Sequence, residues 1–138
     1  RLLTLSIRDS YTFACYLLRS LGLTLGDMVA ISLPNFNQYP FALCGILKAG
    51  LVVVNVNPLY TPRELKHQLS DSKAKAILIL ENFANVLSGI IDDTSVEQVI
   101  ITKMGDMLSF PKNHIVNIVV KYVKKMVPAY EFKQLESF

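Results

Sequence analysis

Two kinds of hydrophobic pattern alternate along the first hundred residues of the chain. In some stretches apolar residues recur every three or four positions, and these are separated by short, almost wholly apolar runs. The first pattern is typical of helices with a buried face, and the second of strands covered on both faces of a sheet. Helices are predicted over 10–21, 38–49, 62–70 and 83–91, and strands over 28–33, 51–56, 76–80 and 96–102. This order favours an α/β fold with a mostly parallel sheet, flanking helices and right-handed crossovers.

The segment 47–65, LKAGLVVVNVNPLYTPREL, contains the clearest local signals. Gly50 is expected to end the helix over 38–49, which is apolar enough to be a buried helix. Thr61 is a candidate N-cap for the next helix, because its hydroxyl can accept a hydrogen bond from an otherwise unpaired backbone N–H. Pro62 fits the first helical position, and Glu64 can reach back to the cap. The segment therefore predicts a helix stop, a buried strand and a capped helix start.

Other helix ends are marked more weakly. Asp9 or Ser10 can cap the first helix and Gly22 can end it, while Asp71-Ser72 is expected to break the helix that begins at Pro62. Two cysteines, Cys15 and Cys44, fall among apolar residues of predicted helices. They are interpreted as buried, reduced thiols.

The composition is apolar for a free-standing domain. The 138 residues suit one domain, but 51% are hydrophobic and the mean hydropathy is +0.37. A membrane-spanning protein does not fit, because no apolar run approaches the ~20 residues that a spanning helix needs. The chain has no signal-peptide pattern and no initiator Met, and both ends look cut. We therefore expect an incomplete piece of a larger protein.

Charge is concentrated near the C-terminus. Residues 1–111 carry nine Lys/Arg and nine Asp/Glu, whereas residues 112–138 carry five Lys and two Glu. This uneven, modest charge argues against a nucleic-acid binder. Residues 112–128 are predicted to form a basic amphipathic helix that presents Lys121, Lys124 and Lys125, followed by a connecting segment over 129–138. The helix fits either the edge of the domain, with solvated lysines, or an anionic membrane surface.

The sequence carries no recognisable catalytic machinery. It contains neither a Gly-x-Gly-x-x-Gly nor a Gly-x-x-x-x-Gly-Lys-Ser/Thr phosphate loop, and no metal-ligand spacing. No Ser/His/Asp or Cys/His arrangement stands out. From its own residues the chain thus offers little support for nucleotide or metal binding.

A family resemblance adds what the residues alone do not. The Leu-Lys-Ala-Gly of 47–50, the strand after it and Asn57-Pro58 resemble an early core motif of the adenylate-forming (AMP-binding) superfamily. The continuation LYTPRELKHQLSDSKA is similar to that of bacterial long-chain fatty-acid–CoA ligases. The preceding GDMVAISLPNFNQYPFALCGILKAG and the following ITKMGDMLSFPKNHIVNIVVKYVKKMVP are also similar, although Met28 stands where the family usually has Arg. The resemblance covers nearly the whole chain.

The resemblance implies a two-step reaction for the complete protein. ATP, with Mg²⁺, and a fatty acid would give an acyl-adenylate and pyrophosphate, and CoA would then give acyl-CoA and AMP. The family's phosphate loop and catalytic lysine lie further along the full chain. No catalytic, cofactor-binding or metal-binding residue therefore carries over, and the 138 residues alone are expected to be inactive.

The resemblance also implies a location and a set of structural residues. A cytoplasmic protein is expected. Peripheral contact with the inner membrane and formation of a homodimer are both left open. Asn55 and Asn57 suit turn formation and backbone bonding at a strand end, or contact with a ligand or a neighbouring subdomain. The alternative to an enzyme piece is a non-catalytic α/β module that binds a partner or a membrane surface. The motif residues assigned structural roles are Lys48, Gly50, Asn55, Asn57, Pro58, Thr61, Pro62 and Glu64.

Overall fold

A five-stranded parallel sheet forms the centre of the protein. The computed structural model describes residues 2–34, 38–103 and 136–137, and the side chains within 10–34 and 38–103. The strands are β1 (Met28–Ser32), β2 (Val52–Asn55), β3 (Ala76–Leu80), β4 (Gln98–Thr102) and β5 (Glu136–Ser137). They are ordered β2-β1-β3-β4-β5, and every neighbouring pair is parallel. The predicted α/β class with a mostly parallel sheet is confirmed.

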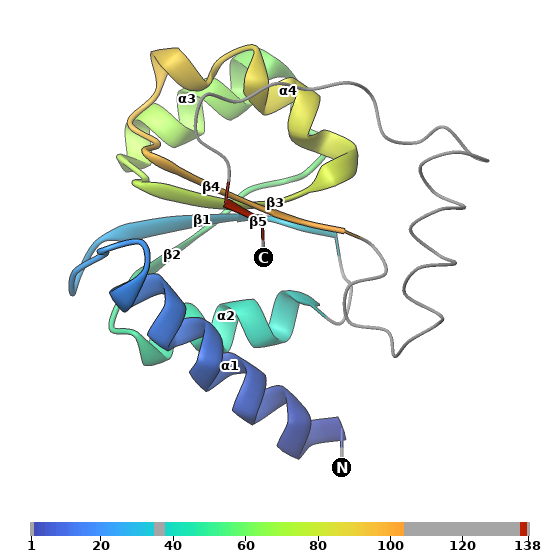
Figure 1. Ribbon diagram of the computed structural model, residues 1–138. Coiled ribbons are helices and arrows are strands. Elements are labelled where there is room, and N and C mark those ends of the chain that lie inside the picture. Colours follow the sequence, from blue (N-terminus) through green and yellow to red (C-terminus); the bar gives the residue numbers. More distant parts are fainter. Residues whose placement is uncertain (1, 35–37, 104–135, 138) are drawn as a thin grey trace.

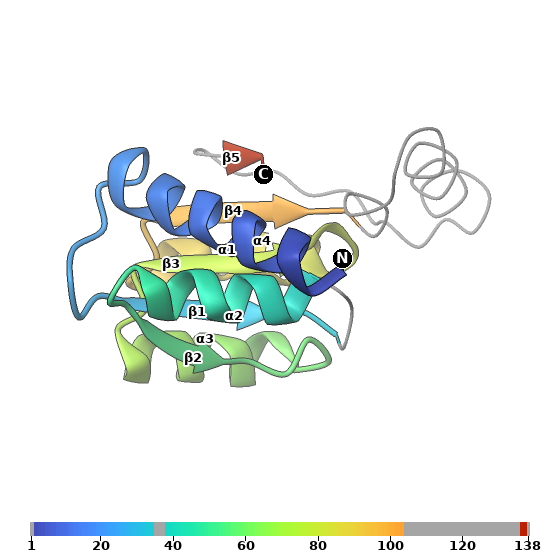
Figure 2. The same cartoon turned by 90° about the horizontal axis from the view of Figure 1, so that it is seen from below.

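Helices cover both faces of the sheet (Figure 1). On one face lie α1 (Leu2–Arg19) and α2 (Gln38–Lys48), side by side across the strands in Figure 2. On the other face lie α3 (Pro62–Ser72) and α4 (Ala84–Ser88), with the 3₁₀ turns η1 (Glu81–Phe83) and η2 (Ile91–Asp93) flanking α4. The result is three layers, helix on sheet on helix.

The central strand explains why two hydrophobic cores form. All five residues of β3 are buried. Because side chains alternate along a strand, Leu78 and Leu80 pack toward α1 and α2, while Ile77 and Ile79 pack toward α3 and α4. A strand covered on both faces has no reason to alternate with polar residues, which is why AILIL reads as one apolar run.

Two helices end in the same backbone motif. After α2, Gly50 (φ 73°) lets the Leu51 N–H donate to the Ile46 carbonyl at 3.1 Å, and its own N–H donates to Leu47 at 3.0 Å. This is a Schellman motif, and Gly50 ends the helix as predicted. After α3 the residue in this position is Lys73, with φ 54°, a conformation that favours glycine. The helix therefore continues through Asp71 and Ser72, where the sequence predicted its break.

Several other expectations need correction. Helix α1 begins at Leu2, so Asp9 and Ser10 lie inside it and cap nothing. The single helix expected over 83–91 is instead two 3₁₀ turns around the five-residue α4. Strand β5 pairs with β4 inside the segment expected only to connect. The predicted basic helix over 112–128 lies outside the described residues.

The cysteine prediction was wrong about burial. Both thiols are free, but Cys15 is only half-buried and Cys44 is exposed. In α2 the buried residues lie on the side toward the sheet and α1, and Cys44 lies away from them. In the part of the chain that the structure describes, no helix is long and apolar enough to cross a membrane.

Candidate functional site

The carboxyl edge of the sheet is where a ligand would be expected. In doubly wound sheets with the order 2-1-3-4-5, the connections leaving β1 and β3 run to opposite faces, and this switch point opens a crevice at the strand ends. Here α2, which follows β1, lies on one face, and α4, which follows β3, lies on the other (Figure 1).

Polar side chains gather at this edge. Ser32 ends β1, Glu81 follows β3, Thr102 ends β4 and Gln38 opens α2, and all four are buried. The Gln38 amide Nε2 donates to the Lys103 carbonyl at 2.8 Å and so ties the start of α2 to the end of β4. Among the described side chains, no buried nitrogen or oxygen lacks a hydrogen-bond partner. These groups are therefore satisfied within the protein and do not by themselves require a ligand.

Sequence reasoning missed this polar set. Its signal is a single polar residue directly after an apolar strand, as Glu81 follows AILIL. That signal is weak, because a polar residue after a strand is usually the first exposed residue of a loop. Its burial becomes evident only once the strand ends are placed side by side.

Asn55 connects the helices on the two faces of the sheet. The Tyr39 hydroxyl of α2 donates to its side-chain oxygen at 2.6 Å, and the Gln68 amide of α3 donates to its backbone carbonyl at 2.8 Å. Because β2 is the edge strand of the described sheet, the second bond also satisfies a carbonyl at the strand end. The bonding role expected of Asn55 is therefore visible in its contacts, and contact with a ligand stays a hypothesis.

Asn57 shapes the turn that follows. Its side-chain oxygen accepts from the Leu59 N–H at 3.0 Å, and its carbonyl accepts from the Tyr60 N–H at 3.1 Å. This is an Asx turn, in which a short polar side chain replaces a backbone partner. Pro58, inside the turn, has no N–H to satisfy and a fixed φ.

The predicted capping box is present at the start of α3. Thr61 accepts from the Glu64 N–H at 3.4 Å, and its own N–H donates to the Glu64 carboxylate at 2.9 Å. Two hydrogen bonds lower the pKa of Glu64: the larger effect comes from the Thr61 backbone N–H, and the smaller from the Thr61 hydroxyl. Pro62 occupies the first turn, as expected.

The last motif residue, Lys48, lies in the final turn of α2. Its side chain is exposed, and a cation there interacts favourably with the negative end of the helix dipole. In these contacts the motif residues stabilise the β2 connection. Among the described side chains, no nucleophile, base or phosphate cradle is brought together around them.

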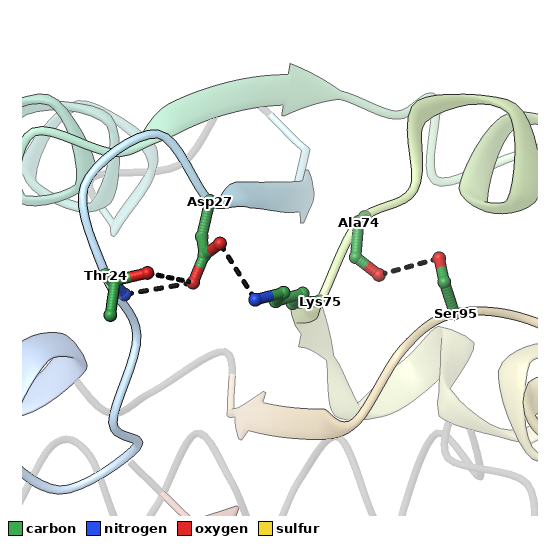
Figure 3. A network of polar contacts seen from close by, with 5 residues as sticks. All are labelled: Thr24, Asp27, Ala74, Lys75 and Ser95. Atoms are coloured by element: carbon green, nitrogen blue, oxygen red, sulfur yellow. Dashed lines mark hydrogen bonds and ion pairs between the residues drawn. The ribbon is translucent and has the colours of Figure 1, made fainter.

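A polar network secures the opposite, amino edge of the sheet (Figure 3). The Asp27 carboxylate accepts from the Thr24 N–H at 2.9 Å and from its hydroxyl at 3.1 Å, and it pairs with the Lys75 ammonium at 2.9 Å. Two hydrogen bonds lower the pKa of Asp27: the larger effect comes from the Thr24 backbone N–H, and the next from the Lys75 side chain. Nearby, the Ser95 hydroxyl donates to the Ala74 carbonyl at 3.1 Å. This network links the segments that precede β1, β3 and β4, on the side away from the expected ligand crevice.

The described residues do not fit a nucleotide or a metal ion. Within 10–34 and 38–103, no three His, Cys, Asp or Glu side chains are placed to hold a metal. Nor does a run of glycines follow a strand there, as close approach to a phosphate requires. No chemical step is therefore assigned to this part of the chain. Lys121, Lys124 and Lys125, the predicted membrane contacts, lie outside the described residues.

Comparison with known proteins decides the family. The family model described as "AMP-binding enzyme" matches residues 8–133. The chain belongs to the AMP-binding enzyme family. It is 57% identical, over 94% of its length, to a long-chain-fatty-acid–CoA ligase of Escherichia coli O6:H1, of which it spans 23%. The chain thus spans about a quarter of this curated relative.

Solved structures agree with the fold of this family. The chain matches a long-chain-fatty-acid–CoA ligase from Archaeoglobus fulgidus with a TM-score of 0.66 at 20% identity, over 92% of this chain and 24% of that one. It matches a benzoate CoA ligase from Burkholderia xenovorans LB400 with the same TM-score, 0.66, at 25% identity, over 70% of this chain and 19% of that one. The three-layer unit is therefore shared by CoA ligases named for different acids.

Proposed function

We propose that the protein containing this chain is an acyl-CoA synthetase that acts on long-chain fatty acids. The observation that carries the proposal is the identity of 57% over 94% of the chain to a long-chain-fatty-acid–CoA ligase. The bacterial relative from Haemophilus influenzae bears the same name at 55% identity. The alternative of a non-catalytic binding module has no comparable support.

The proposed reaction forms a carbon–sulfur bond in two steps. The fatty acid carboxylate first attacks the α-phosphorus of ATP and releases pyrophosphate, which gives an acyl-adenylate. The CoA thiol then attacks the acyl carbon and releases AMP. Mg²⁺ would neutralise the phosphates of ATP. The groups that perform these steps are assigned to parts of the protein outside this chain.

The role proposed for this chain is to hold the sheet and its carboxyl edge in place. The Asn55 and Asn57 contacts, the capping box and the Gln38 bond all fix connections at that edge. Catalysis depends on reacting groups being positioned to within a fraction of an ångström, so a rigid neighbouring unit contributes without touching the substrate.

The product of the reaction tests the proposal. The complete gene product would be incubated with ATP, Mg²⁺, CoA and oleate, and oleoyl-CoA would be measured by mass spectrometry. Benzoate is the matched control acid, since a structural neighbour is named for it. We expect oleoyl-CoA and little or no benzoyl-CoA. Benzoyl-CoA alone would contradict the substrate class, and neither product from a folded protein would contradict the reaction.

The location and assembly of the protein are separate proposals. We propose a cytoplasmic enzyme whose lysines at 121, 124 and 125 contact the inner membrane, from which a fatty acid can be drawn. Each lysine near an anionic surface contributes on the order of 1 kcal/mol, so binding would be weak and salt-sensitive. The triple Lys→Glu variant should pellet less with anionic vesicles, and unchanged pelleting would refute the contact. Light scattering of the whole protein tests for a homodimer.

A further inference from the structure

The first turn of α2 is anchored at two separate places along the carboxyl edge of the sheet. Gln38, the residue that opens α2, donates from its amide Nε2 to the Lys103 carbonyl at 2.8 Å. The next residue, Tyr39, donates from its hydroxyl to the Asn55 side-chain oxygen at 2.6 Å. Lys103 directly follows β4 and Asn55 ends β2, and both β1 and β3 lie between these two strands. One helical turn therefore ties together an edge that is four strands wide.

The burial of Gln38 indicates that its hydrogen bond serves to fix a position. The residue is only 3% exposed, although the rest of α2 before Lys48 is apolar or aromatic. Burying a neutral amide contributes little net stability, because its hydrogen bond mainly offsets the cost of removing the amide from water. What such a bond adds is geometry, since donor and acceptor must keep one distance and one direction. A polar residue at this buried place is therefore best explained by what it holds together.

The Gln38 bond also crosses the switch point of the sheet. Helix α2 follows β1 on one face and α4 follows β3 on the other, so the crevice expected of this topology opens between the ends of β1 and β3 (Figure 1). Gln38 belongs to the β1 side of that point, as the first residue of the helix that follows β1. Lys103 belongs to the other side, because β4 lies beyond β3. The bond therefore joins the two sides of the crevice.

We propose that Gln38 and Tyr39 form a clamp, here called the α2 clamp, that fixes the width of this crevice, and that both are positioning residues for the ligase reaction. The proposal rests on the proposed function, in which substrate meets groups from other parts of the protein at this edge. Neither residue has to touch the substrate, because a misplacement of about 1 Å caused from a distance can lower a rate by about 100-fold. Gln38 has the larger effect, since it is buried, whereas the Tyr39 bond is exposed to water.

Single substitutions in the complete gene product test the α2 clamp. Oleate-dependent release of pyrophosphate would be measured at saturating ATP, oleate and CoA, well below the melting temperature of each variant. Gln38→Leu keeps most of the side-chain volume but cannot donate, and we expect its kcat to fall by roughly tenfold, with a smaller fall for Tyr39→Phe. The matched control is Ser95→Ala, which removes a hydroxyl that donates to the Ala74 carbonyl at the amino edge (Figure 3). Its kcat should equal that of the parent. An unchanged kcat for Gln38→Leu, or an equal loss for Ser95→Ala, would overturn the proposal.

Gln38→Glu separates hydrogen bonding from packing. Glutamate has nearly the shape of glutamine, but its carboxylate cannot donate to the Lys103 carbonyl, whereas the protonated acid can, and burial raises the pKa of such a carboxyl. The ratio of variant to parent kcat should therefore rise as the pH falls, while the ratio for Gln38→Leu stays constant. Glu81 and Lys103, the ionisable side chains beside this bond along the edge, are common to all three proteins, so the ratio removes their own titration. A Gln38→Glu ratio that does not change with pH would overturn the role of the hydrogen bond.

Hydrogen exchange separates the α2 clamp from the proposed function, because it requires no activity. Backbone exchange in the complete protein would be resolved by mass spectrometry at both ends of β2 and β4. In Gln38→Leu we expect faster exchange than in the parent at the carboxyl ends of these strands and no change at their amino ends. If the parent releases no pyrophosphate but exchange changes in this way, the ligase function is wrong and the clamp is supported. If the parent is active and neither kcat nor exchange responds, the clamp is wrong and the ligase function is supported.

Discussion

The contact between α1 and α2 predicts that Gly45→Ala destabilises the protein. Alanine usually stabilises a helix interior by about 1 kcal/mol relative to glycine. Here the new methyl group would lie 2.8 Å from Cδ1 of Phe13 and 3.0 Å from the Ser10 carbonyl oxygen. The Phe13 ring is fully buried, and the other contact is backbone, so neither can move aside at low cost. Overpacking of this kind costs about 1–3 kcal/mol, and two such close contacts place Gly45→Ala in the upper half of that range. After the helix gain of about 1 kcal/mol is subtracted, we expect a net loss of about 1–2 kcal/mol.

Urea unfolding followed by circular dichroism would measure this loss. Gly89→Ala is the matched control, since a Cβ at residue 89 would meet only the Val86 carbonyl, at 3.9 Å. Its φ is −76°, so alanine there should stabilise by about 0.4–1 kcal/mol. The double variant Gly45→Ala/Phe13→Leu should lose less stability than the sum of its single changes, because the smaller side chain makes room for the methyl group. A Gly45→Ala protein as stable as the parent would refute the close packing of the two helices.

Three further predictions concern helix ends and the amino edge of the sheet. Thr61→Ala should lower the unfolding free energy by about 1 kcal/mol through loss of the capping box, and an unchanged urea midpoint would contradict that role. Lys73→Gly should raise the unfolding free energy by about 0.5 kcal/mol, because φ at this residue is 54°, where glycine is less strained than lysine. A destabilised variant would show that the lysine side chain contributes more than the backbone strain costs. Because the pKa of Asp27 is lowered, its stabilising effect is full above the ordinary aspartate pKa of about 3.9 and is lost as the pH falls through the lower value in the folded protein. Asp27→Asn should therefore destabilise at pH 7 and reduce the difference in stability between pH 7 and pH 2, and an unchanged acid dependence would contradict the assignment.

The sequence predicted helices and strands well where neighbouring residues along the chain alone determine the structure, or where burial in the fold favours the same structure. The strand over 76–80 has the predicted bounds, because both of its faces are buried and a charged residue follows it at once. The capping box of Thr61 and Glu64 was predictable because all its partners lie within four residues. Gly50 was predictable for the same reason.

Features that depend on distant parts of the chain were not predictable. The burial of Ser32, Glu81 and Thr102 results from three strand ends lying side by side, and no local pattern encodes that arrangement. Strand β5 pairs with a strand more than thirty residues earlier in the chain. Helix α2 looked buried because it is almost wholly apolar, yet only one of its faces is buried here.

Fatty-acid-dependent release of pyrophosphate from ATP is the measurement that tests the proposed function most directly. The complete gene product and residues 1–138 alone would be assayed side by side with oleate, Mg²⁺ and CoA. We expect release by the complete protein that requires oleate, and none by residues 1–138, because the described part of this chain holds neither a phosphate cradle nor a metal site. Oleate-dependent release by residues 1–138 would contradict the assignment of the chemistry to other parts of the protein. No release by a folded complete protein would contradict the ligase function itself.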